Sequence, residues 1–242
     1  MDIILIPGLW LTDRSWDDVG PRLESAGHRP HPLTLPGMDS AGADRSGVTR
    51  ADHVDAVVAA IDQLADGGAD AGTADAKVLL VGHSMGGVIA WAAAAARLDR
   101  VAGVVFLASE PDVPEPSESM FPVAGADVPL PPWDFFDDEM VADLSDGLRA
   151  RIREGSVPSP VHAVTGGLSF GDDRLHDLPV TMVTAEYDSA QLKEWTEAGE
   201  PGTEEIAALR NVVWVDLHSG HWPQYSRPDD TARVIVEAAA RA

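Results

Sequence analysis

The sequence predicts an α/β protein built on a doubly wound, mostly parallel sheet. Short apolar runs alternate with amphipathic segments along most of the 242 residues, which is the order expected of βαβ units. The runs are continuously apolar, as in strands that are buried on both faces of a parallel sheet. The expected strands are Ile3–Ile6, Arg29–Leu35, Lys77–Val81, Val101–Ala108, Val180–Ala185 and Asn211–Leu217.

Helix-like segments fill the intervals between these runs. In the stretch Arg50–Ala65, Val54, Val57, Val58 and Ile61 recur on one helical face, which favours a helix that packs on a core. The expected helices are Ser15–Ala26, Arg50–Ala65, Gly86–Leu98, Leu192–Ala198 and Pro228–Ala242. A chain of this length commonly forms a single domain in this class of fold.

One insertion interrupts the alternation. Residues 111–178 separate two expected strands by far more than one crossover helix needs, and they are rich in proline and apolar side chains. Within them, Asp137–Arg153 has the apolar spacing of a helix. We therefore expect a single domain in which residues 1–110 and 179–242 form the core. Residues 111–178 would form a helical lid over the carboxyl ends of the strands.

Composition excludes several classes of protein. The chain has 17 basic and 40 acidic side chains, a net charge of −23, and no cysteine. Nucleic acid and anionic membranes are therefore unexpected partners, because both are bound through clustered cations. Disulfides and thiolate chemistry are excluded, and the histidine spacings do not indicate a metal site, so no cofactor is expected. With no apparent signal or membrane-spanning segment, the prediction is a cytoplasmic monomer or homodimer.

The first chemical motif is Gly82-His83-Ser84-Met85-Gly86, which fits the G-x-S-x-G pattern. An apolar strand precedes it and a helix-like segment follows it, which is the context of a nucleophile elbow. Such a sharp turn strains the backbone of its central residue and projects that side chain toward substrate. Ser84 is therefore the expected nucleophile.

A serine hydroxyl needs a base, and His221 is the best placed of eight histidines. It follows the last expected strand and precedes the last helix, which returns its imidazole to the strand ends. The base needs a carboxylate to fix its tautomer. Asp188, in the loop after Val180–Ala185, is the preferred acid. Glu110 is the first alternative and Glu186 the second.

Two backbone N–H groups are expected to bind the oxyanion. Met85 directly follows the nucleophile, and Leu9 lies in the loop after the first strand, where Gly8 allows a sharp turn. The two loops should be adjacent in this fold.

At this point the chain resembles the α/β-hydrolase superfamily, and in particular the lid-bearing branch that contains esterases and plant methylesterases. The segments that carry the resemblance are Ile4–Trp10, Leu35-Pro36-Gly37-Met38, Gly82–Gly87, Ala185–Asp188 and Gly220–Pro228. It implies that Ser84, His221 and Asp188 form the triad and that Leu9 and Met85 form the oxyanion hole. Hydroxynitrile lyases of this branch carry a lysine where Trp222 follows His221 here, which disfavours cyanohydrin cleavage.

The predicted function is a serine hydrolase that cleaves a carboxylic ester or lactone of a small, largely apolar, neutral molecule through an acyl-enzyme. One alternative is a binding or sensor protein on the same fold that turns over slowly or not at all. A cofactor-free C–C hydrolase or perhydrolase is a further alternative. The residues expected to line the substrate pocket are Trp10, Met120, Phe121, Trp133, Phe136 and Trp222.

Overall fold

The core is a six-stranded, all-parallel sheet with the strand order β2-β1-β3-β4-β7-β8. The computed structural model describes residues 1–67, 77–111, 117–168 and 172–242. The α/β prediction is confirmed, and all six expected strands are present. Their bounds are β1 Asp2–Ile6, β2 Arg29–Pro32, β3 Val78–His83, β4 Val101–Leu107, β7 Val180–Thr184 and β8 Val212–Asp216.

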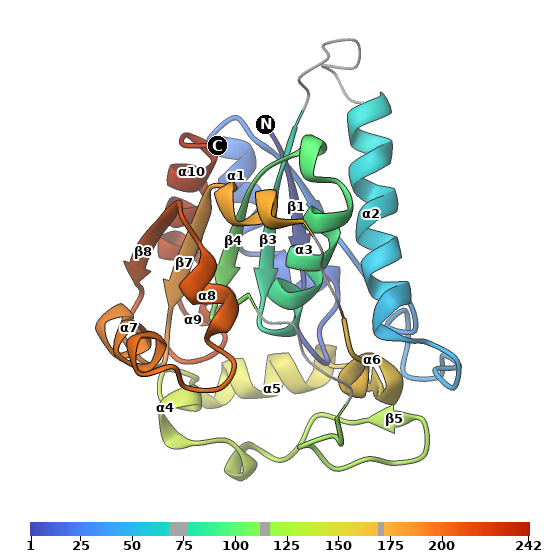
Figure 1. Cartoon of the computed structure of the whole chain (residues 1–242). Helices are drawn as coiled ribbons and strands as arrows, with labels where there is room; N and C mark the ends of the chain where they lie inside the picture. The colour runs from blue at the N-terminus through green and yellow to red at the C-terminus, as the bar shows by residue number, and fades with distance from the viewer. Residues whose placement is uncertain (68–76, 112–116, 169–171) are drawn as a thin grey trace.

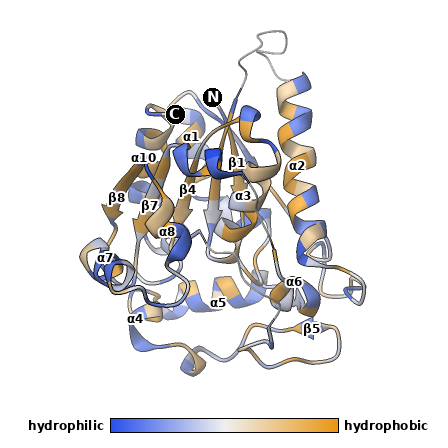
Figure 2. Ribbon diagram, viewed as in Figure 1, coloured by the Kyte–Doolittle hydropathy of each residue, from blue (hydrophilic) through white to orange (hydrophobic). Residues whose placement is uncertain are grey.

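Helices cover both faces of this sheet, as Figure 1 shows. On one face, Ile4, Leu80 and Phe106 pack with residues of α2, α3 and α8. On the other face, Leu5 and Val81 pack with residues of α1 and α10. Successive side chains of the central strands β1, β3 and β4 thus enter different cores, which explains why these strands are largely apolar (Figure 2). The helices of the core are α1 Gly20–Ser25, α2 Arg50–Gly67, α3 Met85–Ala96, α7 Ser189–Ala198, α8 Glu204–Ala208, α9 Pro223–Ser226 and α10 Pro228–Ala239.

Two expected helices begin elsewhere than predicted. The segment Ser15–Ala26 splits into a 3₁₀ turn, Asp13–Trp16, and the short helix α1, which starts with Gly20-Pro21. Pro21 lacks the N–H that would continue a helix from the preceding turn, so a new helix starts there. Helix α7 starts at Ser189, three residues before the predicted start at Leu192. This earlier start changes the role of Asp188, as described below.

The insertion, residues 111–178, lies across the carboxyl ends of the strands (Figure 1). Residues 112–116 and 169–171 are outside its described part. It contains α4 (Asp138–Val141), α5 (Asp146–Gly155), α6 (Val161–Thr165) and a small antiparallel pair, β5 (Asp127–Val128) with β6 (Ser159–Pro160). The single helix predicted over Asp137–Arg153 is broken because Ser145 caps α5, its hydroxyl accepting from the Leu148 N–H at 3.3 Å.

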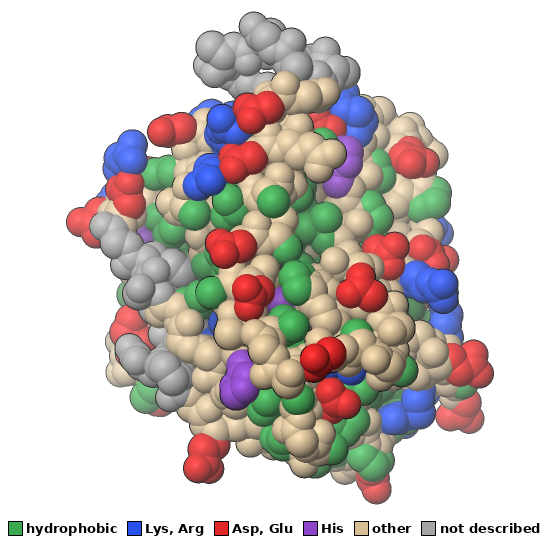
Figure 3. All heavy atoms as spheres, turned by 90° about the vertical axis from the view of Figure 1, so that its right-hand side faces the viewer, with side chains coloured by type: hydrophobic (Ala, Val, Ile, Leu, Met, Phe, Trp, Pro, Cys, Tyr) green, Lys and Arg blue, Asp and Glu red, His purple; other side chains and the backbone are tan. Residues whose placement is uncertain are grey.

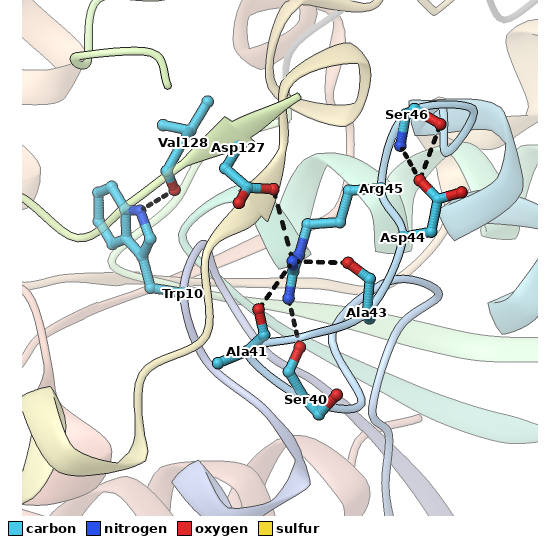
Figure 4. Close-up of polar contacts among 9 residues, drawn as sticks. All are labelled: Trp10, Ser40, Ala41, Ala43, Asp44, Arg45, Ser46, Asp127 and Val128. Atoms are coloured by element: carbon cyan, nitrogen blue, oxygen red, sulfur yellow. Dashed lines mark hydrogen bonds and ion pairs between the residues drawn. The ribbon is translucent and has the colours of Figure 1, made fainter. Parts of the chain in front are cut away.

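Two core residues fasten β5 of the insertion to the core (Figure 4). The indole N–H of Trp10 donates to the carbonyl oxygen of Val128 at 3.0 Å. The guanidinium of Arg45 is buried and lies 3.4 Å from the Asp127 carboxylate. Arg45 also donates to carbonyl oxygens of its own loop, those of Ala43 (2.9 Å), Ala41 (3.3 Å) and Ser40. One buried cation thus orders the loop after β2 and contacts the insertion.

The acidic side chains do not form one patch on the face seen in Figure 3, where they are spread over the surface among a few basic ones. In the described part of the chain, no helix is both long and apolar enough to cross a bilayer.

Candidate active site

Ser84 occupies the turn between β3 and α3. Its backbone has φ 51° and ψ −127°, a left-handed region that costs a non-glycine residue on the order of 1–3 kcal/mol. Both main-chain polar groups of Ser84 are hydrogen-bonded, which stabilises this turn. The Ser84 N–H donates to Leu107 O (3.1 Å), and the Ser109 hydroxyl donates to Ser84 O (2.6 Å). Gly82 leaves the necessary space, since a Cβ there would lie 2.3 Å from the carbonyl oxygen of Gly86.

His221 lies in the loop between β8 and α9, and its imidazole meets the serine. Its Nε2 is 2.9 Å from Ser84 Oγ, within hydrogen-bond distance. The main chain of this residue is also fixed, because its N–H donates to the carbonyl oxygen of Met140 in α4 at 2.8 Å. The structure therefore brings together the predicted nucleophile, which follows the central strand β3, and the predicted base, which follows the edge strand β8.

The carboxylate on the other side of the imidazole is Glu186. It forms a short hydrogen bond with Nδ1 of His221, and both side chains are largely buried. The expectation that Asp188 would make this contact is therefore wrong. Asp188 caps α7 instead, its side chain accepting from the Gln191 N–H at 2.9 Å. Glu186, the second alternative from the sequence, holds the position that was expected for Asp188 or, as the first alternative, for Glu110.

A local sequence signal could have found this difference. Asp188 stands three residues before Gln191 at the start of an amphipathic stretch, the spacing of a capping box. A residue that caps the helix directs its side chain at the first turn and away from the sheet edge. Glu186 comes two residues after β7 ends, before this turn begins, and its side chain reaches His221.

The environment of Glu186 favours its ionised form. Burial alone would raise the pKa of this carboxyl group, but the hydrogen bond and the charge of His221 outweigh it, and the pKa lies below its usual value. Glu186 is thus an anion at neutral pH. An anion at this position fixes the proton on Nδ1 of His221 and leaves Nε2 free to accept from Ser84.

The loop after β1 packs directly against the elbow. A Cβ on Gly8 would lie 2.9 Å from Ser84 Cβ, so the two loops are in contact. Within the described residues, the hydrogen bonds leave the backbone N–H groups of Leu9 and Met85 without a protein acceptor. A developing oxyanion requires free backbone donors of this kind beside the nucleophile.

The residues expected to line the substrate pocket fall into two groups. Trp10, Phe136 and Trp222 are buried in a third apolar cluster, which joins the insertion to the active-site loops. Phe121 and Trp133 pack on this cluster and are partly exposed, while Met120 is mostly exposed. The rings meet edge to face, for example Trp222 with Phe136 at 5.3 Å between centroids. These three buried rings are therefore part of the core between the insertion and the active-site loops, and Phe121 and Trp133 are the rings with accessible surface.

A cleft of about 640 Å³ lies beside Glu186 and does not include Ser84 in its lining. It runs between α4 and the loops after β7 and β8, and its lining includes Glu186, Asp188 and Asp143 but neither Ser84 nor His221. Among the residues that the structure describes, no cluster of three or more His, Asp or Glu side chains could hold a metal ion.

Comparison with known proteins shows the family to which the chain belongs. The model of the alpha/beta hydrolase family matches residues 3–234, and the chain belongs to this family. Methylesterase 7 of Arabidopsis thaliana is 25% identical, over 98% of this chain and 95% of that protein.

Two solved structures share the fold. One is the methylesterase MES16 from Arabidopsis, with a TM-score of 0.74, 16% identity and full coverage of both chains. The other is an extracellular alpha/beta-hydrolase from a Paenibacillus species, described as sharing structural and functional homology with tobacco salicylic acid binding protein 2. It has a TM-score of 0.73, 21% identity and coverage of 98% of each chain.

Proposed function

We propose that the protein is a serine hydrolase that cleaves carboxylic esters. The observation that carries this proposal is the continuous hydrogen-bonded chain from Ser84 Oγ through His221 to Glu186. In this proposal Glu186 is the acid of the triad, and Leu9 and Met85 supply the oxyanion hole. The similarity to Methylesterase 7 supports an ester as the substrate class.

The chemistry follows from the positions of these groups. Ser84 Oγ attacks the ester carbonyl carbon while its proton passes to Nε2 of His221, and the carbonyl oxygen becomes an oxyanion that accepts from the N–H groups of Leu9 and Met85. Each such donor contributes about 3 kcal/mol to transition-state stabilisation in comparable sites. Glu186 stabilises the imidazolium that forms. When the intermediate collapses, the leaving alkoxide takes the proton from Nε2 and an acyl-enzyme remains.

Hydrolysis of the acyl-enzyme repeats these steps with water as the nucleophile. Water gives its proton to Nε2 of His221, attacks the acyl carbon, and releases the acid as Ser84 regains a proton. A small neutral ester or lactone fits best, because a chain with a net charge of −23 repels anionic substrates. In this proposal the insertion acts as the lid, and the accessible surfaces of Phe121 and Trp133 face the substrate.

The test is labelling with a fluorophosphonate probe, followed by hydrolysis of p-nitrophenyl esters of increasing acyl length, methyl esters and lactones. Wild type should be labelled at Ser84, as located by peptide mass spectrometry, and Ser84→Ala should lose both labelling and turnover. Ser226→Ala is the matched control. Ser226 lies in α9, and its hydroxyl donates to Trp222 O at 3.4 Å, so this serine is not bonded to His221 Nε2. A wild-type protein that is neither labelled nor active would refute the proposal and favour a binding protein on this fold.

A further inference from the structure

His83, next to the nucleophile in sequence, is fully buried between three segments of the active site. Its Nε2 lies 2.6 Å from the main-chain carbonyl oxygen of His221. Its Nδ1 faces the loop after β1, where a Cβ on Gly8 would lie 2.8 Å from it, and has no hydrogen-bond partner among the described residues. The centroids of the His83 and His221 imidazole rings are 5.2 Å apart.

These contacts define the protonation state of His83. A carbonyl oxygen only accepts, so Nε2 carries a proton, and a neutral ring then leaves Nδ1 without one. Burial, reinforced by the nearby His221, lowers the pKa of His83 to about 3. The ring is therefore neutral at neutral pH and donates through Nε2.

We propose that His83 is a positioning residue, whose Nε2–H holds the main chain of His221 at the distance from Ser84 that proton transfer needs. This proposal rests on the proposed function. His83 and Ser84 are consecutive residues. The imidazole that is hydrogen-bonded to the His221 loop and the hydroxyl that His221 deprotonates are therefore fixed relative to each other. The distance that this hydrogen bond would maintain is the 2.9 Å between Ser84 Oγ and His221 Nε2. A displacement of about 1 Å in such a contact can cost 10²-fold in rate.

The alternative is that His83 only fills space in the core. Three substitutions separate these roles, because glutamine can place an N–H donor near the position of Nε2, asparagine is too short to do so, and leucine has no donor. We expect His83→Gln to keep kcat within about threefold of wild type. His83→Asn and His83→Leu should lower kcat by about 10- to 100-fold at nearly unchanged KM.

His53 provides the matched control. It is also buried, its Nε2 lies 2.9 Å from the carbonyl oxygen of Pro36, and burial lowers its pKa too. His53→Leu removes the same kind of hydrogen bond away from the triad, so it should lower the melting temperature without lowering kcat. If His83→Leu has the effects of His53→Leu, or if His83→Gln is as slow as His83→Leu, the proposal is wrong.

A measurement that does not depend on turnover keeps the two proposals apart. Nitrogen-15 NMR of the wild-type protein should show His83 as the neutral Nε2–H tautomer from pH 5.5 to 9. A titrating His83, or one protonated on Nδ1, would refute the positioning role whatever the activity. A wild type that shows the expected tautomer but no labelling at Ser84 would instead refute the proposed function, and with it any role of this hydrogen bond in catalysis.

Discussion

The main-chain N–H of His221 donates to the carbonyl oxygen of Met140, 2.8 Å away, so the proposed base is hydrogen-bonded directly to the insertion. The preceding residue, Gly220, also packs against α4 and the residues after it. Gly220 packs so tightly that a Cβ on it would lie 2.5 Å from both Met140 O and a carboxylate oxygen of Asp143. Movement of α4 and movement of the histidine loop are therefore coupled.

Gly220→Ala should separate α4 from the histidine loop. No real Cβ is found at 2.5 Å from another heavy atom, so either His221 or α4 must shift. We expect kcat/KM to fall by at least about tenfold, through kcat, because the shift acts on the distance between His221 and Ser84. Steady-state kinetics on the best p-nitrophenyl ester would measure it. Gly155→Ala, in α5 where a Cβ would meet nothing within 4 Å, is the control and should keep full activity.

Substitution of Glu186 should affect activity, whereas substitution of Asp188 should affect only stability. Glu186→Gln keeps the shape but removes the charge that fixes the tautomer of His221, and kcat should fall by about 10³–10⁴-fold, as in other triads. Asp188→Asn retains a good helix cap and should change neither activity nor stability much. Asp188→Ala should lower the free energy of unfolding by about 1 kcal/mol while activity remains. A larger loss of kcat in Asp188→Asn than in Glu186→Gln would reverse our assignment.

The loop that carries Leu9 depends on one serine of the insertion. Trp10 has a φ of 65°, and its main-chain N–H donates to the buried hydroxyl of Ser159 at 2.8 Å. Ser159→Ala leaves this N–H buried without an acceptor, which should cost about 1–3 kcal/mol of stability. Because Leu9 is the adjacent residue, kcat should fall as well. Chemical denaturation and kinetics would show both effects, and Ser25→Ala, whose exposed hydroxyl contacts Pro21 O, should show neither.

Asp2 should make stability depend on pH in the acid range. Its hydrogen bonds with Arg29, together with His31, lower its pKa to about 2, below the ordinary 3.8. A carboxyl group with a lowered pKa stabilises the folded state above its unfolded pKa, and this contribution disappears as the pH falls from about 4 to 2. Asp2→Asn should therefore cost about 1–2 kcal/mol at pH 7, less than the full linkage value because Arg29 is partly exposed.

Urea unfolding of wild type and Asp2→Asn at pH 7, 5, 4 and 3 would check this prediction. The difference between the two proteins should be constant down to pH 5 and shrink below pH 4. Asp229→Asn is a suitable comparison, since its pair with Arg22 is exposed and should contribute little at any pH. A difference that grows on acidification would contradict the sign of the shift.

The parts of the site that the sequence could predict are those defined by local pattern. Ser84 stands in a strand-turn-helix motif, and His221 follows the last strand, so chain order alone places both at one edge of a parallel sheet. The acid could not be chosen this way. Glu186 and Asp188 both follow β7, and only the start of α7 at Ser189 decides which side chain caps the helix and which reaches His221.

The interior of the insertion was the least predictable part. Aromatic residues of the insertion and of the His221 loop have the composition of a substrate pocket, yet Phe136 and Trp222 pack edge to face as core. Composition cannot separate these cases, because a pocket wall and a core use the same side chains. The contacts of Arg45 with loop carbonyls likewise join residues with no sequence pattern in common.

The attachment of β5 to the core has a consequence for engineering this protein. Trp10, which is adjacent to the proposed oxyanion donor, is hydrogen-bonded to Val128, and Arg45 forms an ion pair with Asp127. Consecutive residues of one short strand therefore contact two separate loops of the core (Figure 4). The insertion is therefore not a module that can be exchanged for that of a relative to obtain a new specificity alone. A chimaera would have to carry Trp10 and the Arg45 loop along with it, or lose rate together with selectivity.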